Sequence, residues 1–236
     1  MERAPPVKRR GDSLRKSKAN RISAVLLAAG TSSRFGGTKQ LARIDPRGSL
    51  IERAVATLKS SRVDHIVVVV GNRSEEVSAK LGRQDRRLRV VVNPAFKTGL
   101  SSSLRVGVKA AEKSDAIVIV LADQPLVDSQ LIDDIIERHE KTGNPIVVSA
   151  SGELVSPPAL FHRSVYDELQ GLEGDVGARP VILSHPGFER VEVDRGTLLD
   201  VDTKSDIQRA RSIISGPGKG TTKVRGAGRR GRAPPS

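Results

Sequence analysis

Residues 24–41 combine small, hydroxyl-bearing and basic residues in a pattern suited to holding phosphate. They read AVLLAAGTSSRFGGTKQL, in which Gly30, Arg34, two glycines and Lys39 follow an apolar run. The run Ile22–Ala29 has the length of a buried strand, and the glycines and serines after it predict a loop. Small residues let backbone N–H groups approach a ligand closely, and Arg34 and Lys39 add positive charge. The stretch indicates a polyphosphate site, although a plain surface turn would explain Gly30 or Arg34 taken singly.

Carboxylates at two later points could hold a metal ion beside such a site. Asp123 directly follows an apolar run, where burial disfavours its charge unless a cation compensates. Opposite a triphosphate that cation would be Mg²⁺, which prefers carboxylate and phosphate oxygens. In Leu199–Thr203, an extended chain would place Asp200 and Asp202 on one face and Val201 on the other. Helix capping or a turn would explain either group of acids equally simply.

Apolar runs of strand length alternate with helical patterns between residues 22 and 215. The runs have no alternating polar face, which is typical of parallel sheets covered by helices on both sides. The alternation predicts a single α/β domain with a Rossmann-like, doubly wound, mostly parallel sheet. The predicted strands are Ile22–Ala29, His65–Val70, Leu88–Val92, Ala116–Leu121 and Ile146–Ala150, and the predicted helices are Leu50–Lys59, Ser74–Leu81, Ser101–Glu112 and Asp128–Glu140.

The ends of four predicted strands carry small or polar residues. They are Gly30, Gly71 with Asn72, Asn93 with Pro94, and Asp123. Ligands of doubly wound sheets bind outside the carboxyl ends of the strands. We therefore expect phosphate donors, amides and a carboxylate to lie along one edge of the sheet.

The net charge of +13 is concentrated at the two ends of the chain. Residues 1–21 and 216–236 each carry a net +6, and residues 22–215 carry +1. Both ends are rich in Pro, Gly and Ser, so we expect disordered tails flanking the 22–215 domain. The tails either solubilise the protein or make weak contact with nucleic acid or acidic lipid, and they hold no aromatic residues for base stacking.

Composition excludes several other classes of site. The chain has no cysteine, which removes disulfides and thiolate metal ligands. It has no apolar run long enough for a membrane span and no apolar signal-peptide core. The sequence also lacks G-x-x-x-x-G-K-[ST], and no G-x-G-x-x-G follows the first strand. The expectation is a cytoplasmic protein with a phosphate loop of another kind.

The loop resembles the nucleotidyltransferase signature L-A-A-G-x-S-x-R-(M/F)-G…K, in the variant with Lys-Gln-Leu typical of molybdenum cofactor cytidylyltransferases and related enzymes. Further motifs keep the family's order over roughly residues 22–214. They are the N-P-x-(W/F)-x-x-G-(M/L)-x-x-S-L, A/G-D-x-P, P-x-L-F with G-D-x-G-A-R, and D-I-D-T segments, which begin here at Asn93, Ala122, Pro158, Gly174 and Asp200. The resemblance implies the fold of the nucleotide-diphospho-sugar transferases and an NTP whose triphosphate is wrapped by the loop.

Carried over residue by residue, the resemblance assigns roles to particular positions. It implies catalytic roles for Arg34, Lys39 and Asp123, with Mg²⁺ on Asp123 and Asp202. Asp200 would be the weaker metal ligand. The nucleotide would contact Leu27, Ala28, Ala29, Gly30, Lys39, Asn93, Gly99, Ser102 and Ser103, although a plain N-cap serine would also explain the serines.

The second substrate would contact Pro158, Phe161, Asp175 and Arg179. Asp175 could instead cap a helix, and Arg179 could pair with a neighbouring acid. The chain departs from the family just before the P-x-L-F proline, where it has Leu154-Val155-Ser156-Pro157 instead of glycine with histidine or asparagine. Recognition of the acceptor is the part of the resemblance that this departure affects.

The implied reaction is in-line attack by a terminal phosphate of molybdopterin on the α-phosphorus of CTP, with release of pyrophosphate. Phosphate is already nucleophilic near pH 7, so no Ser–His or Cys–His pair is required. Ala29, where guanylyltransferases carry glycine, favours CTP over GTP. The alternatives are another NTP, another small acceptor such as a sugar phosphate, or a non-catalytic nucleotide-binding protein. A molybdoenzyme or a chaperone is the further partner that the resemblance suggests.

Overall fold

The computed structural model describes residues 20–32, 34–46 and 48–216. The predicted disorder of the basic ends lies outside these residues, apart from Asn20, Arg21 and Gly216. A seven-stranded sheet in the order β5-β4-β1-β6-β8-β7-β9 forms the centre of the molecule. Its strands are β1 (Ile22–Ala28), β4 (His65–Val70), β5 (Leu88–Val92), β6 (Ala116–Leu121), β7 (Ile146–Ser151), β8 (Leu154–His162) and β9 (Glu189–Glu192). The mostly parallel, doubly wound sheet predicted from the sequence is confirmed.

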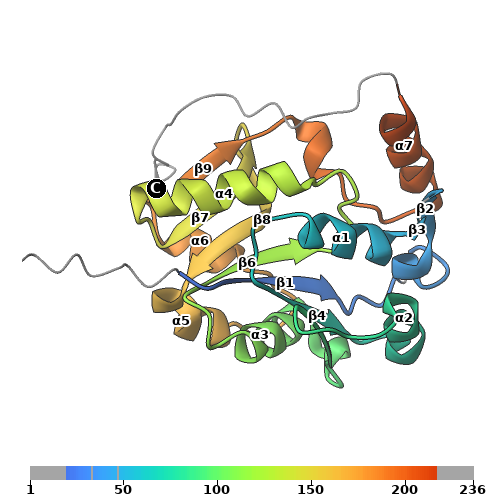
Figure 1. The fold of residues 1–236 in the computed structure, drawn as a ribbon, viewed down its shortest axis with the longest axis horizontal. Helices are drawn as coiled ribbons and strands as arrows, with labels where there is room; N and C mark the ends of the chain where they lie inside the picture. Colours follow the sequence, from blue (N-terminus) through green and yellow to red (C-terminus); the bar gives the residue numbers. More distant parts are fainter. Residues whose placement is uncertain (1–19, 33, 47, 217–236) are drawn as a thin grey trace, which may run out of the picture.

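Helices cover both faces of this sheet (Figure 1). On one face, α1 (Leu50–Lys59), α2 (Ser74–Leu81) and α4 (Ser129–Thr142) enclose one cluster of buried apolar side chains. On the other face, α3 (Leu100–Ala110), α5 (Tyr166–Gln170) and α6 (Arg179–Ser184) enclose a second cluster. A third, small cluster joins α7 (Lys204–Ser215) to the hairpin of β2 (Arg43–Asp45) and β3 (Gly48–Ser49).

Helices α1 and α4 begin where the sequence provides capping groups. The carboxylate of Glu52 accepts hydrogen bonds from the backbone N–H and the Oγ of Ser49 at the start of α1, at 2.8 and 2.7 Å. At the start of α4, the Asp128 carboxylate accepts from the Leu131 N–H at 2.9 Å. The apolar stripe that includes Leu131 and Ile135 is fully buried against the sheet.

Two predicted helices have shifted boundaries in the structure. The third begins at Leu100 and ends at Ala110, where Ser101–Glu112 was predicted. The fourth runs to Thr142 rather than Glu140, and ends at Gly143, whose φ of 66° is favoured by glycine. Predicted helices Leu50–Lys59 and Ser74–Leu81 are confirmed at both ends.

The strand β8 was not predicted and runs antiparallel to both of its neighbours. It contains Pro157 and Pro158, which cannot donate ladder hydrogen bonds and which argue against an interior strand in sequence reading. A register shift in the β7–β8 pairing between Val148 and Ser149 accommodates this part of the strand.

Strands β5, β4, β1 and β6 are adjacent and mutually parallel. Their carboxyl ends therefore meet at one edge of the sheet, as the polar residues after each run led us to expect. Within the described residues, the structure contains no helix that is both long and apolar enough to cross a membrane.

Candidate active site

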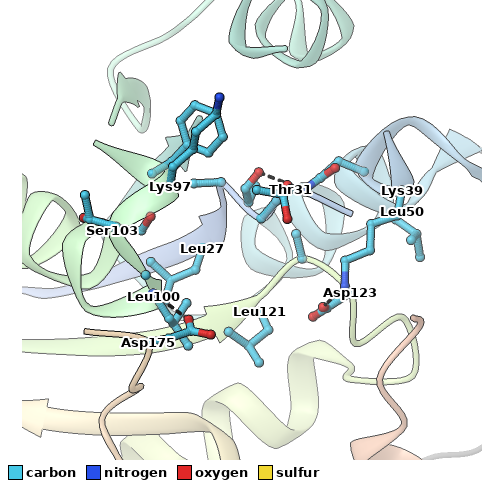
Figure 2. Close-up of a pocket in the computed structure, with 18 of the residues that line it drawn as sticks. Leu27, Thr31, Lys39, Leu50, Lys97, Leu100, Ser103, Leu121, Asp123 and Asp175 are labelled. Carbon is cyan, nitrogen blue, oxygen red and sulfur yellow. Dashed lines mark hydrogen bonds and ion pairs between the residues drawn. The ribbon is translucent and has the colours of Figure 1, made fainter. Parts of the chain in front are cut away.

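A cavity of about 510 Å³ opens at the carboxyl edge of the four parallel strands. Its walls come from the end of β1, the short helix Lys39–Leu41, the start of α3 and the end of β6 (Figure 2). The predicted site residues that line it are Leu27, Ala28, Ala29, Gly30, Arg34, Lys39, Gly99, Ser103, Asp123 and Asp175.

Lys39 is the centre of a charged cluster between this cavity and a smaller one beside it, which Asp202 lines together with Arg34 and Lys39. Its Nζ lies 2.6 Å from Asp123 Oδ2 and 3.1 Å from Asp202 Oδ1. Burial alone would lower the pKa of the ammonium, but the charge of Asp123 and the hydrogen bonds to both carboxylates raise this pKa above its usual value. Lys39 therefore stays protonated at neutral pH, as a charge stabiliser beside phosphate must.

Arg34 extends the cluster toward solvent. Its guanidinium lies 3.2 Å from the carboxylate of Asp202, and its side chain is 76% exposed. The exposure leaves the guanidinium free to turn toward a ligand, because an exposed ion pair contributes little stability.

Gln40 holds the loop in place and was not assigned a role from the sequence. Its side chain is 2% exposed, and Nε2 donates to the backbone oxygens of Ala28 at 3.0 Å and Gly30 at 3.2 Å. Its Oε1 accepts from the Oγ of Ser32 at 3.2 Å. These bonds fix Lys39, the preceding residue, relative to the end of β1. In the sequence, the position of Gln40 next to Lys39 is the feature that could have indicated this role.

Asp123 is braced by the segment that carries Asp202. The backbone oxygen of Asp123 accepts from the Val201 N–H at 2.9 Å, and Val201 is fully buried. Asp202 and Asp200, on either side of it, have separate contacts. Asp202 faces Lys39, whereas Asp200 Oδ1 accepts from Gln124 Nε2 at 3.0 Å. Desolvation and the nearby charge of Asp123 raise the pKa of Asp200 above its usual value.

The donor set fits a divalent cation that is shared with phosphate. Asp123 and Asp202 both reach the same ammonium, so one cation lies within reach of two carboxylates. Among the described residues, no three His, Asp or Glu side chains form a complete metal-binding group. Mg²⁺ is commonly held by one or two carboxylates together with substrate phosphates and water, which agrees with this arrangement.

Asn93 and Ser102, which we expected to contact the nucleotide, are turned inward in the structure. Asn93 is 1% exposed, and its Nδ2 donates to the Oγ atoms of Ser102 and Ser103, each at 2.9 Å. Ser102 Oγ in turn donates to the backbone oxygens of Gly99 at 2.8 Å and Ala95 at 3.1 Å. These polar groups are satisfied within the protein, so they shape the loop before α3 rather than present donors at its surface.

Gly99 and Asp175 connect that loop to residues 174–178. Gly99 has a φ of 116°, and a Cβ there would lie 2.3 Å from the Gly174 oxygen. Asp175 Oδ1 accepts from the Leu100 N–H at 3.1 Å, and the Gly174 oxygen accepts from Ser101 Oγ at 2.7 Å. Asp175 thus lines the cavity and also caps α3 (Figure 2).

Pro158 and Phe161, which we expected to contact the acceptor, do not line the cavity. Both lie in β8 and are buried, and Phe161 is 0% exposed within the second apolar cluster. The reason is topological, because β8 lies between β6 and β7 in the interior of the sheet. Arg179 is exposed at the start of α6 and is absent from the described residues that line the cavity.

The sequence matches the family model described as the MobA-like NTP transferase domain over residues 24–190. The chain belongs to the MobA-like NTP transferase family. It is 31% identical over 205 residues to the purine catabolism protein PucB of Bacillus subtilis, covering 81% of this chain and 96% of PucB. It is 30% identical over 199 residues to nicotine blue oxidoreductase of Paenarthrobacter nicotinovorans, covering 80% and 95%.

Among solved structures, the MobA-like fold of this chain is similar to that of Rv0371c from Mycobacterium tuberculosis. The TM-score is 0.72 with 28% identity, over 82% of this chain and 98% of Rv0371c. Rv0371c has also been solved as a complex with manganese. Together with the family match, these similarities make the chain a nucleotidyltransferase.

Proposed function

We propose that this MobA-like enzyme transfers CMP from CTP to the terminal phosphate of molybdopterin and releases pyrophosphate. The observation that supports the proposal most strongly is the meeting of Lys39, Asp123 and Asp202 at the mouth of a cavity lined by the Gly30 loop. Two carboxylates and a protonated lysine beside exposed backbone donors suit the charge of a magnesium triphosphate.

In the proposed reaction, the chain supplies position and charge. Backbone N–H groups around Gly30, with Arg34 and Lys39, hold the triphosphate. An oxygen of the acceptor phosphate forms a bond to the α-phosphorus of CTP, and the bond from that phosphorus to the pyrophosphate oxygen breaks. Lys39 stabilises the negative charge that builds on the α-phosphoryl oxygens, where a fixed donor is most effective.

Asp123 and Asp202 are the residues that would hold Mg²⁺, and the ion would neutralise part of the triphosphate charge when bound. Lys39 pairs with both carboxylates in this structure. In the nucleotide complex, its ammonium would therefore turn from the carboxylates to the phosphates.

Ala29 supports cytosine as the base. It lines the cavity and is 5% exposed. Its methyl group occupies space that a glycine would leave open, so the smaller base suits the pocket better. The test is the ratio of CTP to GTP turnover in the wild type and in Ala29→Gly. We expect the ratio to fall in the variant.

Pyrophosphate release tests the proposal directly. CTP, GTP, ATP and UTP are each offered with molybdopterin, a sugar phosphate or an alditol phosphate. We expect release with CTP and molybdopterin, and we expect Lys39→Ala and Asp123→Asn each to lower turnover by about 100-fold or more. Lys141→Ala removes an exposed lysine that pairs with Glu137 on α4 and serves as the matched control.

The outcomes distinguish the possible substrates of the enzyme. Release with a sugar phosphate and not with molybdopterin would identify the sugar phosphate as the acceptor. Faster release with GTP than with CTP would identify guanine as the preferred base. Full activity in both Lys39→Ala and Asp123→Asn would reject the catalytic assignment of this cavity.

A further inference from the structure

Two hydrogen-bonded contacts in the described part of the chain join the segment from Lys39 to the end of α1 with the loop 122–127 after β6. One is the ion pair between the Lys39 ammonium and the Asp123 carboxylate, at 2.6 Å (Figure 2). In the other, Arg53 of α1 donates from Nε to the backbone oxygen of Pro125 at 2.6 Å. Arg53 and Pro125 are not among the described residues that line the cavity, so this second contact supports the loop from outside the site.

The guanidinium of Arg53 is itself fixed by a second partner. Its Nη1 lies 2.8 Å from Asp45 Oδ2, and the side chain of Asp45 is 4% exposed. A planar guanidinium holds its donors in a rigid geometry, so the ion pair with Asp45 directs Nε at Pro125. Pro125 is buried, and a buried backbone oxygen requires a donor. Arg53 therefore links β2, α1 and the loop after β6 through one side chain.

The same loop is held from its other side by the segment before α7. The backbone oxygen of Asp123 accepts from the Val201 N–H at 2.9 Å, and the side chain of Gln124 donates to Asp200 at 3.0 Å. These bonds fix the loop relative to the second carboxylate of the site. Arg53 fixes it relative to the segment that follows the glycine-rich loop.

Binding of a nucleotide would change the two contacts differently. In the proposed reaction, the Lys39 ammonium turns from Asp123 to the phosphates, so the ion pair between the two segments opens. The bond from Arg53 to Pro125 involves neither the substrate nor the cation, and it stays in place. A divalent cation shared between a carboxylate and phosphate needs the two at a fixed separation. Once Lys39 has turned away, Arg53 maintains that separation from this side of the loop.

We propose that Arg53 is a positioning residue that keeps Asp123 in place for the metal–nucleotide complex after Lys39 has turned to the phosphates. The inference rests on the proposed function, and it gives Arg53 no contact with the substrate. Residues that support a metal ligand typically contribute about 10- to 100-fold to metal affinity. Loss of Arg53 should therefore weaken the contribution of Mg²⁺ to nucleotide binding and leave binding without the metal nearly unchanged.

Calorimetric titration of the full-length protein with α,β-methylene-CTP, in excess MgCl₂ and separately in EDTA, tests the proposal. For the wild type we expect Mg²⁺ to tighten binding. In Arg53→Met the Kd in EDTA should stay within about twofold of the wild type, whereas the Kd in MgCl₂ should rise about 10-fold. The ratio of the two Kd values measures the coupling between metal and nucleotide, which a general loss of stability would not change.

Arg87→Met is the matched control. Arg87 is also half-buried, and it donates to the backbone oxygens of Lys59, Ser61 and Val63 at 2.7 to 2.9 Å. These residues lie near the amino-terminal ends of β4 and β5, at the edge of the sheet opposite the cavity. Arg87→Met should lower Tm, as Arg53→Met does, and should keep the wild-type ratio of Kd values.

Arg53→Lys provides a second variant, which keeps a positive charge beside Asp45. One ammonium replaces the two nitrogens that reach Asp45 and Pro125, so the ratio of Kd values should fall between those of the wild type and Arg53→Met. If Arg53→Met does not fold, a ratio in Arg53→Lys below that of the wild type supports the proposal, and a wild-type ratio overturns it.

The remaining outcomes separate this proposal from the proposed function. If Mg²⁺ tightens binding equally in the wild type and in Arg53→Met, the role of Arg53 is overturned and the proposed function stands. An equal fall of the ratio in Arg53→Met and Arg87→Met overturns that role as well, because the effect is then one of general stability. A wild type that binds the analogue in neither solution overturns the proposed function, and the role of Arg53 with it.

Discussion

A single buried amide decides where the central lysine of the site can lie. Gln40 gives both of its Nε2 hydrogens to backbone oxygens at the end of β1 and accepts from Ser32. Backbone oxygens buried without a donor are costly, so this residue both stabilises the loop and fixes its path.

Replacing Gln40 by methionine should therefore affect stability and activity together. The oxygens of Ala28 and Gly30 lose their donor, so the free energy of unfolding should fall by about 1–3 kcal/mol. Catalysis should fall as well, because Lys39 is no longer held relative to β1. Urea unfolding and pyrophosphate release measure the two effects. Gln208→Met, at an exposed position of α7, is the control and should change neither.

The residue scale also shows the limit of motif reading. Asp123 follows a recognisable strand end, and the resemblance to the family's loop and D-I-D-T motifs brought Lys39 and Asp202 to the same site. Asn93, Ser102 and Phe161 belong to equally clear motifs, yet they are 1%, 4% and 0% exposed. A motif records that a residue type is required, and it does not distinguish contact with a ligand from support of the loop that contacts it.

At the scale of elements, the start of α7 positions one of the two site carboxylates. Asp206 Oδ2 accepts from the N–H groups of Thr203 at 2.8 Å and Asp202 at 3.1 Å, while Thr203 Oγ1 accepts from the Asp206 N–H at 3.3 Å. This reciprocal capping ties the main chain of Asp202 to the first turn of the helix.

We expect Asp206→Ala to lower kcat/KM about 10-fold, since Asp202 loses its support. Stability should fall by about 1 kcal/mol with the lost cap. Asp206→Asn keeps an acceptor oxygen and should restore most of both. If Asp206→Ala has wild-type activity and reduced stability, then Asp206 caps α7 but does not support Asp202 in catalysis.

The capping contribution should also depend on pH. Hydrogen bonds from Thr203 lower the pKa of Asp206 in the folded protein. A carboxylate with a depressed folded-state pKa stabilises the fold above its unfolded pKa of about 3.9 and loses that contribution as the pH falls through the folded value. The stability difference between wild type and Asp206→Ala should therefore be constant from about pH 6 to 8 and shrink below about pH 4. Urea unfolding at pH 7 and pH 3.5 measures it.

The elements that sequence reading placed correctly share one property, which is that local pattern alone specifies them. His65–Val70 and Leu50–Lys59 have a continuous apolar run and an amphipathic stripe, and their bounds agree with the structure. β8 depends on partners far along the chain, and its two prolines contradict a strand locally. β9 has only four residues, Glu-Arg-Val-Glu, of which one is apolar, so it is too short and too polar to be recognised.

At the scale of the whole molecule, ligand binding should stabilise three segments at once. Lys39, Asp123 and Asp202 come from separate parts of the chain, and Lys39 and Asp202 are 163 residues apart. CTP with Mg²⁺ at 100 times Kd should add about 2.7 kcal/mol to the free energy of unfolding, which corresponds to a rise in Tm of roughly 5–10 °C. Lys39→Ala should show a much smaller rise. An equal rise in the wild type and in Lys39→Ala, measured by thermal unfolding, would place the nucleotide elsewhere.

The contact between Gly99 and Gly174 leaves no room for even a methyl group, and Asp175 closes it with a hydrogen bond to Leu100. The loop that begins α3 and the loop that precedes α6 are thereby a single mechanical unit. Any shift of the first on capturing one substrate carries the second with it. Because coupling between two sites is reciprocal, a nucleotide bound against the first loop and an acceptor bound against the second should each change the affinity for the other by the same factor.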